Sequence, residues 1–145
     1  MLDNTDPPAG RRWPHVVRLA LFVAFLLAML ATSVTAAPLA TQSSTESGVT
    51  VKATPTSVTG GRWSFEIELE THSGDLSDDL VKSVSLVADD GAALSPLDWR
   101  GDPPGGHHRK GTLEFKAVEP PPARIELKIL RAGEPAPRMF GWQLR

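Results

Sequence analysis

The 145-residue sequence contains no cysteine. Disulfide bonds, thiolate metal sites and a cysteine nucleophile are therefore excluded, and so is a lipid anchor that needs an N-terminal cysteine. A folded domain in this chain must be held together by the packing of apolar side chains, without the covalent reinforcement that small exported domains often have.

Signatures of several enzyme classes are also missing. No Gly-x-Ser-x-Gly nucleophile turn occurs. Ser73 and its neighbour His72 do not make a nucleophile and base pair, because adjacent side chains do not normally point at each other. The pair Gly105-Gly106 is followed by histidines and not by a helix that could receive a phosphate. The sequence therefore favours a non-catalytic protein over an enzyme.

The chain also lacks an excess of positive charge beyond its N-terminal segment. The residues after Ala36 include 12 Lys and Arg against 15 Asp and Glu, a net charge of −3. Nucleic acid and anionic membrane surfaces both require a basic face, so neither is expected as a partner of this part of the chain. Membrane contact is expected only through the N-terminal segment.

The N-terminal segment has the composition of a secretory signal peptide. Three arginines precede an apolar run of 13 residues, Leu19 to Ala31, and small residues follow as far as Ala37. Cleavage after Ala36 fits this order best, and it would release a secreted or periplasmic protein.

A retained leader is the alternative. The apolar run is shorter than the roughly 20 residues that span a bilayer. However, no charged residue occurs from Leu19 to Thr45, so a helix from Val16 to Ala36 could serve as a transmembrane signal anchor. The basic residues precede the apolar run in either case, which predicts that the rest of the chain lies outside the cytoplasm.

Composition divides the chain into three parts. Residues 1–36 are the signal peptide or signal anchor, residues 37–48 are rich in Ser and Thr and read as a flexible tether, and residues 49–145 form one domain. The 109 residues after the leader are enough for a single domain and too few for two.

Alternation of apolar and polar residues predicts strands throughout the domain. The clearest runs from Trp63 to Glu70, with apolar side chains at the odd positions. Others are expected at 49–54, 83–88, 92–97, 112–117, 125–130 and 139–144, with a tight turn at 89–91 and one helical turn at 77–80 that Ser77 would cap. Seven short strands predict an all-β fold, namely an immunoglobulin-like antiparallel β-sandwich, with a small open barrel as the alternative.

The same alternation predicts the core. Tryptophans 63, 99 and 142 are expected to help fill it in place of the missing disulfide. The side chains expected to point inward are Val49, Val51, Phe65, Ile67, Leu69, Leu86, Leu113, Phe115, Ile125, Leu127 and Ile129.

The three histidines after the leader lie in two polar segments, the first at residues 71–80 and the second at residues 99–111. Imidazoles beside carboxylates suit Zn(II), Cu(II) or Ni(II). The candidate metal ligands are His72, His107, His108, Asp75 and Asp102. Their spacing matches no compact metal motif, and the alternative is that the histidines only hydrogen-bond to loop backbone.

The two polar segments are expected to form one surface at one end of the fold, where β-sandwiches carry their functional loops. Asp75 and Arg109 have opposite charges, and a pair between them would join the segments even without an ion. His107 and His108 would point to opposite faces of a regular strand, so both reach one ion only if Gly105-Gly106 makes the backbone irregular.

Two motifs carry a resemblance. Thr71-His72-Ser73-x-Asp75-Leu76 and Gly105-Gly106-His107-His108-Arg109-x-Gly111, with Trp99 between them, resemble segments of a group of uncharacterised exported prokaryotic β proteins. The resemblance covers about residues 49–145. It implies a small single-domain β protein behind a signal or lipoprotein leader, and it implies no assigned activity and no catalytic residue.

Two functions follow as hypotheses. The first is an exported, non-catalytic domain that binds a transition metal, Zn or Cu, through His72, His107 and His108. The second is a structural or protein-interaction module at the outer face of the membrane, without a metal. Imidazoles that share one ion must converge to within about 5 Å, so their placement discriminates between the two.

Overall fold

The computed structural model describes residues 39–89 and 91–145. The leader, for which a signal peptide or an anchoring helix is expected, lies outside these described residues. Within them, no helix is long and apolar enough to cross a membrane.

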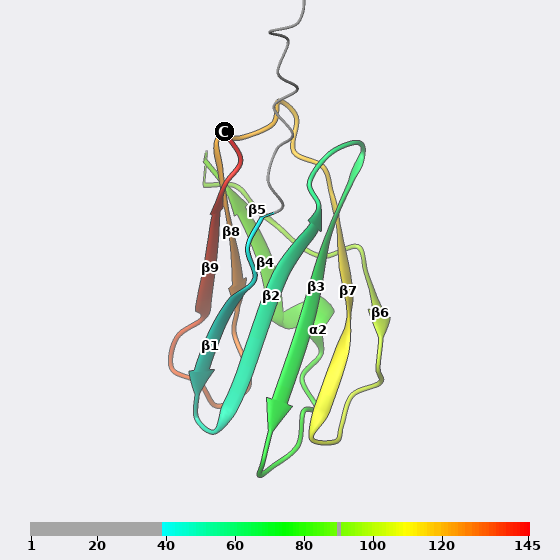
Figure 1. The fold of residues 1–145 in the computed structure, drawn as a ribbon, viewed down its shortest axis with the longest axis vertical. Coiled ribbons are helices and arrows are strands. Elements are labelled where there is room, and N and C mark those ends of the chain that lie inside the picture. Colours follow the sequence, from blue (N-terminus) through cyan, green and yellow to red (C-terminus); the bar gives the residue numbers. More distant parts are fainter. Residues whose placement is uncertain (1–38, 90) are drawn as a thin grey trace, which may run out of the picture. The chain divides into compact units, whose positions relative to one another are not determined.

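The described part of the chain is all-β and contains two antiparallel sheets (Figure 1). The five-stranded sheet has the order β1 (Gln42–Glu46), β2 (Val49–Ser57), β3 (Arg62–Thr71), β7 (His108–Lys116), β6 (Asp98–Gly101). The four-stranded sheet has the order β5 (Ala93–Leu94), β4 (Val84–Ala88), β8 (Arg124–Ile129), β9 (Arg138–Gln143). A single helical turn, α2 (Leu80–Ser83), leads into β4.

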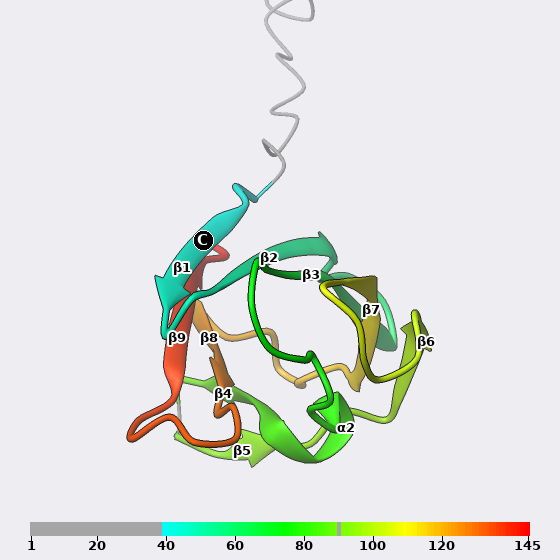
Figure 2. The same ribbon diagram turned by 90° about the horizontal axis from the view of Figure 1, so that it is seen from below.

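The two sheets enclose one hydrophobic core (Figure 2). All eleven positions predicted to point inward are buried, and Val49 at 6% is the most exposed of them. Phe65 on β3 lies 5.8 Å from Trp142 on β9 between ring centroids, so aromatic packing joins the two sheets. Trp63 is also buried, whereas Trp99 is half-buried against the rim of the core. The predicted core is therefore confirmed.

The expected tether contains a strand. Residues 42–46 form β1 at the edge of the five-stranded sheet, and the Gln42 side-chain amide bonds to both backbone groups of Gly141 on β9. The Trp142 indole also donates to the carbonyl oxygen of Ala40 at 2.7 Å. A Ser/Thr-rich composition predicted flexibility, but these cross-sheet bonds give the segment fixed partners, so the folded domain begins before residue 49.

A buried arginine, Arg138, also binds the backbone of β1 and the start of β2. The Arg138 side chain is fully buried, pairs with Glu134, and donates to the carbonyl oxygens of Ser44, Glu46 and Val49. It thereby ties the turn between β1 and β2 to the start of β9.

Two local predictions need correction. The described residues form nine strands and not seven, because β1 and the short β6 were not expected. The helical turn is capped by Asp79, whose carboxylate accepts from the amide of Val81 at 3.1 Å, and not by Ser77. The residue before this cap, Asp78, is buried in an ion pair with Arg131. The predicted tight turn after β4 is present, with Gly91 at φ 75° and its amide bonded to the carbonyl of Ala88.

Candidate functional site

The two polar segments lie side by side at one end of the domain, as expected. The amide of Thr71 donates to the carbonyl of His107 at 2.9 Å. Leu76 and the glycine pair continue this contact, since the amide of Leu76 donates to Gly106 at 3.1 Å and that of Gly105 donates back to Leu76 at 3.0 Å. We call the exposed residues of 72–77 and 103–107 the loop-end surface.

Arg109 lies beneath the loop-end surface and is 2% exposed. Its Nη1 atom donates to the carbonyl oxygens of Leu76 at 3.3 Å and Asp78 at 2.6 Å, and its Nε atom donates to that of Asp102 at 3.2 Å. One guanidinium thus satisfies main-chain acceptors of both polar segments. A buried carbonyl without a donor would be costly, so these bonds hold the loops in one arrangement.

The predicted pairing of Arg109 with Asp75 is not formed. Arg109 points into the domain from β7 and meets carbonyl oxygens there, whereas the Asp75 side chain is exposed. The tie between the segments exists, but backbone oxygens replace the carboxylate as its acceptors. Burial lowers the pKa of Arg109, and the negative charges of Asp78, Asp102 and Asp79 act in the opposite direction.

Trp99 covers Arg109 from the neighbouring strand. The guanidinium carbon lies 5.2 Å from the centroid of the indole ring, within range of a cation–π contact. The indole also lies over two facing glycines: a Cβ on Gly111 would come within 2.7 Å of the indole and 2.6 Å of Gly101 Cα. The glycines of the second polar segment therefore admit a tryptophan that closes this corner of the core.

The five predicted metal ligands do not converge. In the described ranges, only one group of three or more His, Asp or Glu side chains has its ligating atoms within 4.8 Å of one another, and of the predicted residues it includes His108 alone. His108 is the first residue of the regular strand β7, while His107 lies in the loop before it. Two glycines with positive φ, Gly105 and Gly106, make the backbone irregular just before the pair, yet His107 joins no group of ligating side chains with His108 in the described residues.

His108 instead lies on the outer face of the five-stranded sheet. It pairs in register with Glu70, and its Nε2 atom is 3.6 Å from a carboxylate oxygen of Glu68 and 3.9 Å from one of Glu70. Lys52 approaches the same carboxylates from β2, with its Nζ atom 3.1 Å from Glu68 and 3.3 Å from Glu70. On the other side, Lys110 lies 3.9 Å from Glu68.

These charges shift one another's protonation. The hydrogen bond from Lys52 is the main reason that the pKa of Glu68 is lowered, and the bonds to Glu68 and Glu70 raise the pKa of Lys52. The pKa of Lys110 is raised mainly by its hydrogen bond to Glu66. Glu68 is therefore held in its ionised form on this face.

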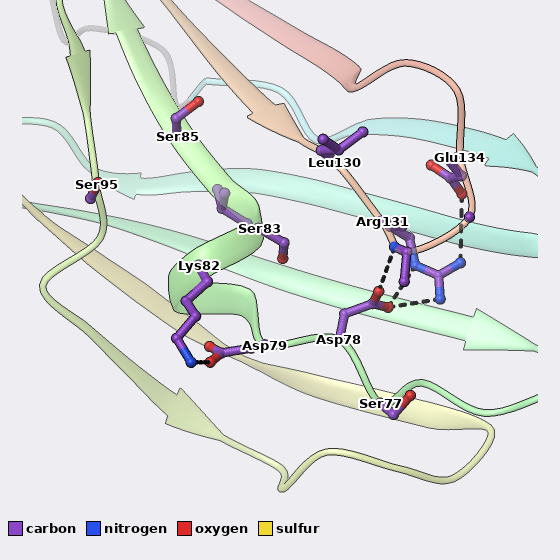
Figure 3. Close-up of a pocket in the computed structure, with 13 residues that line it drawn as sticks. Ser77, Asp78, Asp79, Lys82, Ser83, Ser85, Ser95, Leu130, Arg131 and Glu134 are labelled. Carbon is purple, nitrogen blue, oxygen red and sulfur yellow. Dashed lines mark hydrogen bonds and ion pairs between the residues drawn. The ribbon is translucent and has the colours of Figure 1, made fainter.

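A second polar feature is an open depression of about 820 Å³ beside α2 (Figure 3). At its floor, Arg131 makes a buried ion pair with Asp78, with its Nη2 atom 2.8 Å from the carboxylate, and it lies 3.6 Å from Glu134. Lys82 and Asp79 form an exposed pair at its rim. The charged groups at its floor and rim are thus already matched within the domain.

The sequence did not predict that Glu68 and Glu70 lie next to a histidine. Both belong to the best-predicted strand and alternate on its polar face, which reads as an ordinary solvent-facing pattern. Only the register between β3 and β7, which places His108 opposite Glu70, brings the three together. Alternating glutamates on a strand were the one available signal, and they give no partner strand.

No protein-family model, curated protein or solved structure matches this chain.

Proposed function

We propose that the chain is an exported, non-catalytic β-sandwich of immunoglobulin-like architecture that binds a protein partner through its loop-end surface. Support for export comes from the order of basic, apolar and small residues in the leader. The leader would either be cleaved after Ala36 or be retained as an anchor at the outer face of the membrane. Support for the architecture comes from the two antiparallel sheets and their common core.

The main support for the proposal is that the loop-end surface combines a hydrogen-bonded main chain with polar side chains that have no partner within the described residues. His72, Asp75 and His107 are exposed, and no hydrogen bond or ion pair engages their side chains within the described residues. The main chain beneath them is held by hydrogen bonds between the segments and by Arg109. A surface ordered in advance binds with a smaller entropy cost than a mobile loop does.

The direction of the chain also supports this surface. β1 runs toward the turn at Glu46 and Val49, and Val49 pairs with Thr71 at the start of the first polar segment (Figure 1). β1 therefore begins at the end of the domain opposite the loop-end surface. The start of β1 thus does not cover the loop-end surface.

An enzymatic function has less support. The buried carboxylates of Asp78 and Glu134 are paired with Arg131 and Arg138. A carboxylate engaged in this way stabilises the fold, while a general acid or base needs access to a reacting group. A metal function through His72, His107 and His108 together has less support as well, because no group of converging side chains in the described residues contains more than one of these imidazoles.

The proposal can be tested by site-specific photo-crosslinking of the full chain in the cells that produce it. A photoreactive residue at His107 should give one discrete adduct outside the cytoplasm. The matched control is the same residue at Thr54, on the outer face of β2 and away from the loop-end surface. Equal adducts from both positions, or none from His107, would contradict binding through the loop-end surface.

A further inference from the structure

The outer face of the five-stranded sheet carries a set of side chains with ligand chemistry. Glu68 and Glu70 project from one face of β3, and His108 stands opposite Glu70 on β7. One nitrogen and two carboxylate oxygens, one from each side chain, lie within 4.8 Å of one another. All three residues belong to paired strands, so their backbones are fixed relative to one another.

The spacing of these atoms is close to that of ligands on one ion. Zinc binds histidine nitrogen and carboxylate oxygen at about 2.0–2.2 Å, so two ligands of a tetrahedral ion lie about 3.3–3.6 Å apart. The imidazole Nε2 atom of His108 is 3.6 Å from Glu68 and 3.9 Å from Glu70. The ligand atoms of Glu68 and Glu70 also lie within 4.8 Å of each other, so side-chain rotations of the two carboxylates and the imidazole would bring all three to that spacing, and water would complete the fourth position.

In this structure Lys52 is the cation paired with both carboxylates. Its Nζ atom lies 3.1 Å from the same Glu68 oxygen that faces His108. The ammonium is on a flexible stem with 36% of the side chain exposed, so it can swing into solvent when a divalent ion takes its place.

We propose that Glu68, Glu70 and His108 form a surface site for a divalent transition metal of the zinc class, in exchange with the Lys52 ammonium. The set of one imidazole and two carboxylates suits Zn(II), whereas a typical calcium site uses oxygen ligands alone. The site lies on the face of the sheet and not in the loop-end surface, and it is independent of the proposed protein-binding function.

The test is isothermal titration of the full chain, in a mild detergent near neutral pH, with Zn(II) alone as the probe. His108→Ala should weaken binding by at least about tenfold, because even residues that only support a metal ligand cost about that much. The matched control is His107→Ala, which removes the adjacent exposed imidazole and should leave the affinity unchanged. Proton NMR should show Zn(II) shifting the ring signals of His108 and not those of His107.

A second variant tests the exchange with lysine. Lys52→Met removes the competing ammonium and should tighten Zn(II) binding about twofold to fivefold, the range expected for loss of an exposed ion pair. All these positions are surface-exposed or half-buried, and circular dichroism would verify that the variants fold. No uptake by the unmodified chain, equal loss in His107→Ala and His108→Ala, or unchanged affinity in Lys52→Met would overturn the proposal.

Discussion

The Nη1 atom of Arg109 lies 2.6 Å from the main-chain carbonyl oxygen of Asp78, to which it donates a buried hydrogen bond. Arg138 makes the same kind of contact at the opposite edge, where it donates to the carbonyl of Val49 at 2.8 Å. In each case a buried arginine on a strand donates to main-chain carbonyls of an earlier segment, which is the stretch before α2 for Arg109 and the residues flanking the β1–β2 turn for Arg138. The sequence has no cysteine, so no disulfide can fix these segments to the strands. Buried guanidinium groups, each with several hydrogen-bond donors, fix them instead.

Replacing Arg109 with alanine should destabilise the domain strongly. The change leaves carbonyls of both polar segments without a donor, and the expected cost is about 2–4 kcal/mol in the free energy of unfolding. Urea denaturation measures it. Arg100→Ala is the control, because Arg100 has 64% of its side chain exposed and its pairs with Asp98 and Glu114 lie at the surface. That variant should lose no more than about 1 kcal/mol. Equal losses would refute the role of Arg109.

Gly111→Ala should destabilise the corner under Trp99. The added Cβ would meet the carbonyl oxygen of Arg100 at 2.6 Å and the indole at 2.7 Å. Overpacking of this kind costs about 1–3 kcal/mol. Gly61→Ala is the matched control: no atom lies within 4 Å of its Cβ position, and its change should stay within about 0.5 kcal/mol. Thermal unfolding of the two variants compares them, and a stable Gly111→Ala protein would mean that Trp99 does not lie there.

Gln42→Ala tests whether residues 42–46 belong to the domain. The amide of Gln42 pairs with both backbone groups of Gly141, so its loss should cost about 1–2 kcal/mol. Ser43→Ala, on the adjacent exposed position, should have almost no effect on denaturant unfolding. If the two variants unfold alike, this segment is a tether after all.

The Lys52 and Glu68 pair predicts a pH dependence. The folded-state pKa of Glu68 is lowered, so the stability that this pair contributes is present above the unfolded pKa of about 4.3 and is lost as the pH falls through the folded value. The raised pKa of Lys52 sets the other limit: the contribution holds below the unfolded value of about 10.4 and is lost as the pH rises through the folded value.

Carbon-detected NMR titration of the Glu68 carboxyl group measures this shift. The midpoint should lie below that of an ordinary glutamate in the unmodified protein and should rise in Lys52→Met. High salt should reduce the difference, because the pair is exposed to solvent. A midpoint that does not respond to Lys52→Met would show that Lys52 is not the partner.

The sequence predicted the core because burial follows a local rule. Residues such as Phe65, Ile67 and Leu69 alternate within one strand, and one face of that strand had to be apolar. β1 escaped prediction because Gln42 to Glu46 has no apolar face. It pairs with β2 next to it in the sequence, and the Gln42 side chain bonds to Gly141, 99 residues away. A Ser/Thr-rich segment can be ordered by contacts with other strands, and its own composition does not reveal those contacts.

The site was predicted in part. Glycine and polar content predicted that the two polar segments meet, since such segments cluster at the ends of β domains. The partner of Arg109 was assigned by charge, but a buried guanidinium is satisfied by any correctly placed oxygen, and Asp78 supplies its carbonyl. The Glu68, Glu70 and His108 group depends on strand register, and alternation within one strand does not reveal register.

The most direct measurement is native-state amide hydrogen exchange at the loop-end surface. A preorganised surface requires that the amides of Leu76 and Gly105, which bond across the two segments, exchange nearly as slowly as those of core strands such as β3. Arg109→Ala should release these two amides first while β3 stays protected. Exchange of Leu76 and Gly105 at the rate of an unstructured chain would contradict a fixed loop-end surface, and with it the basis for partner binding there.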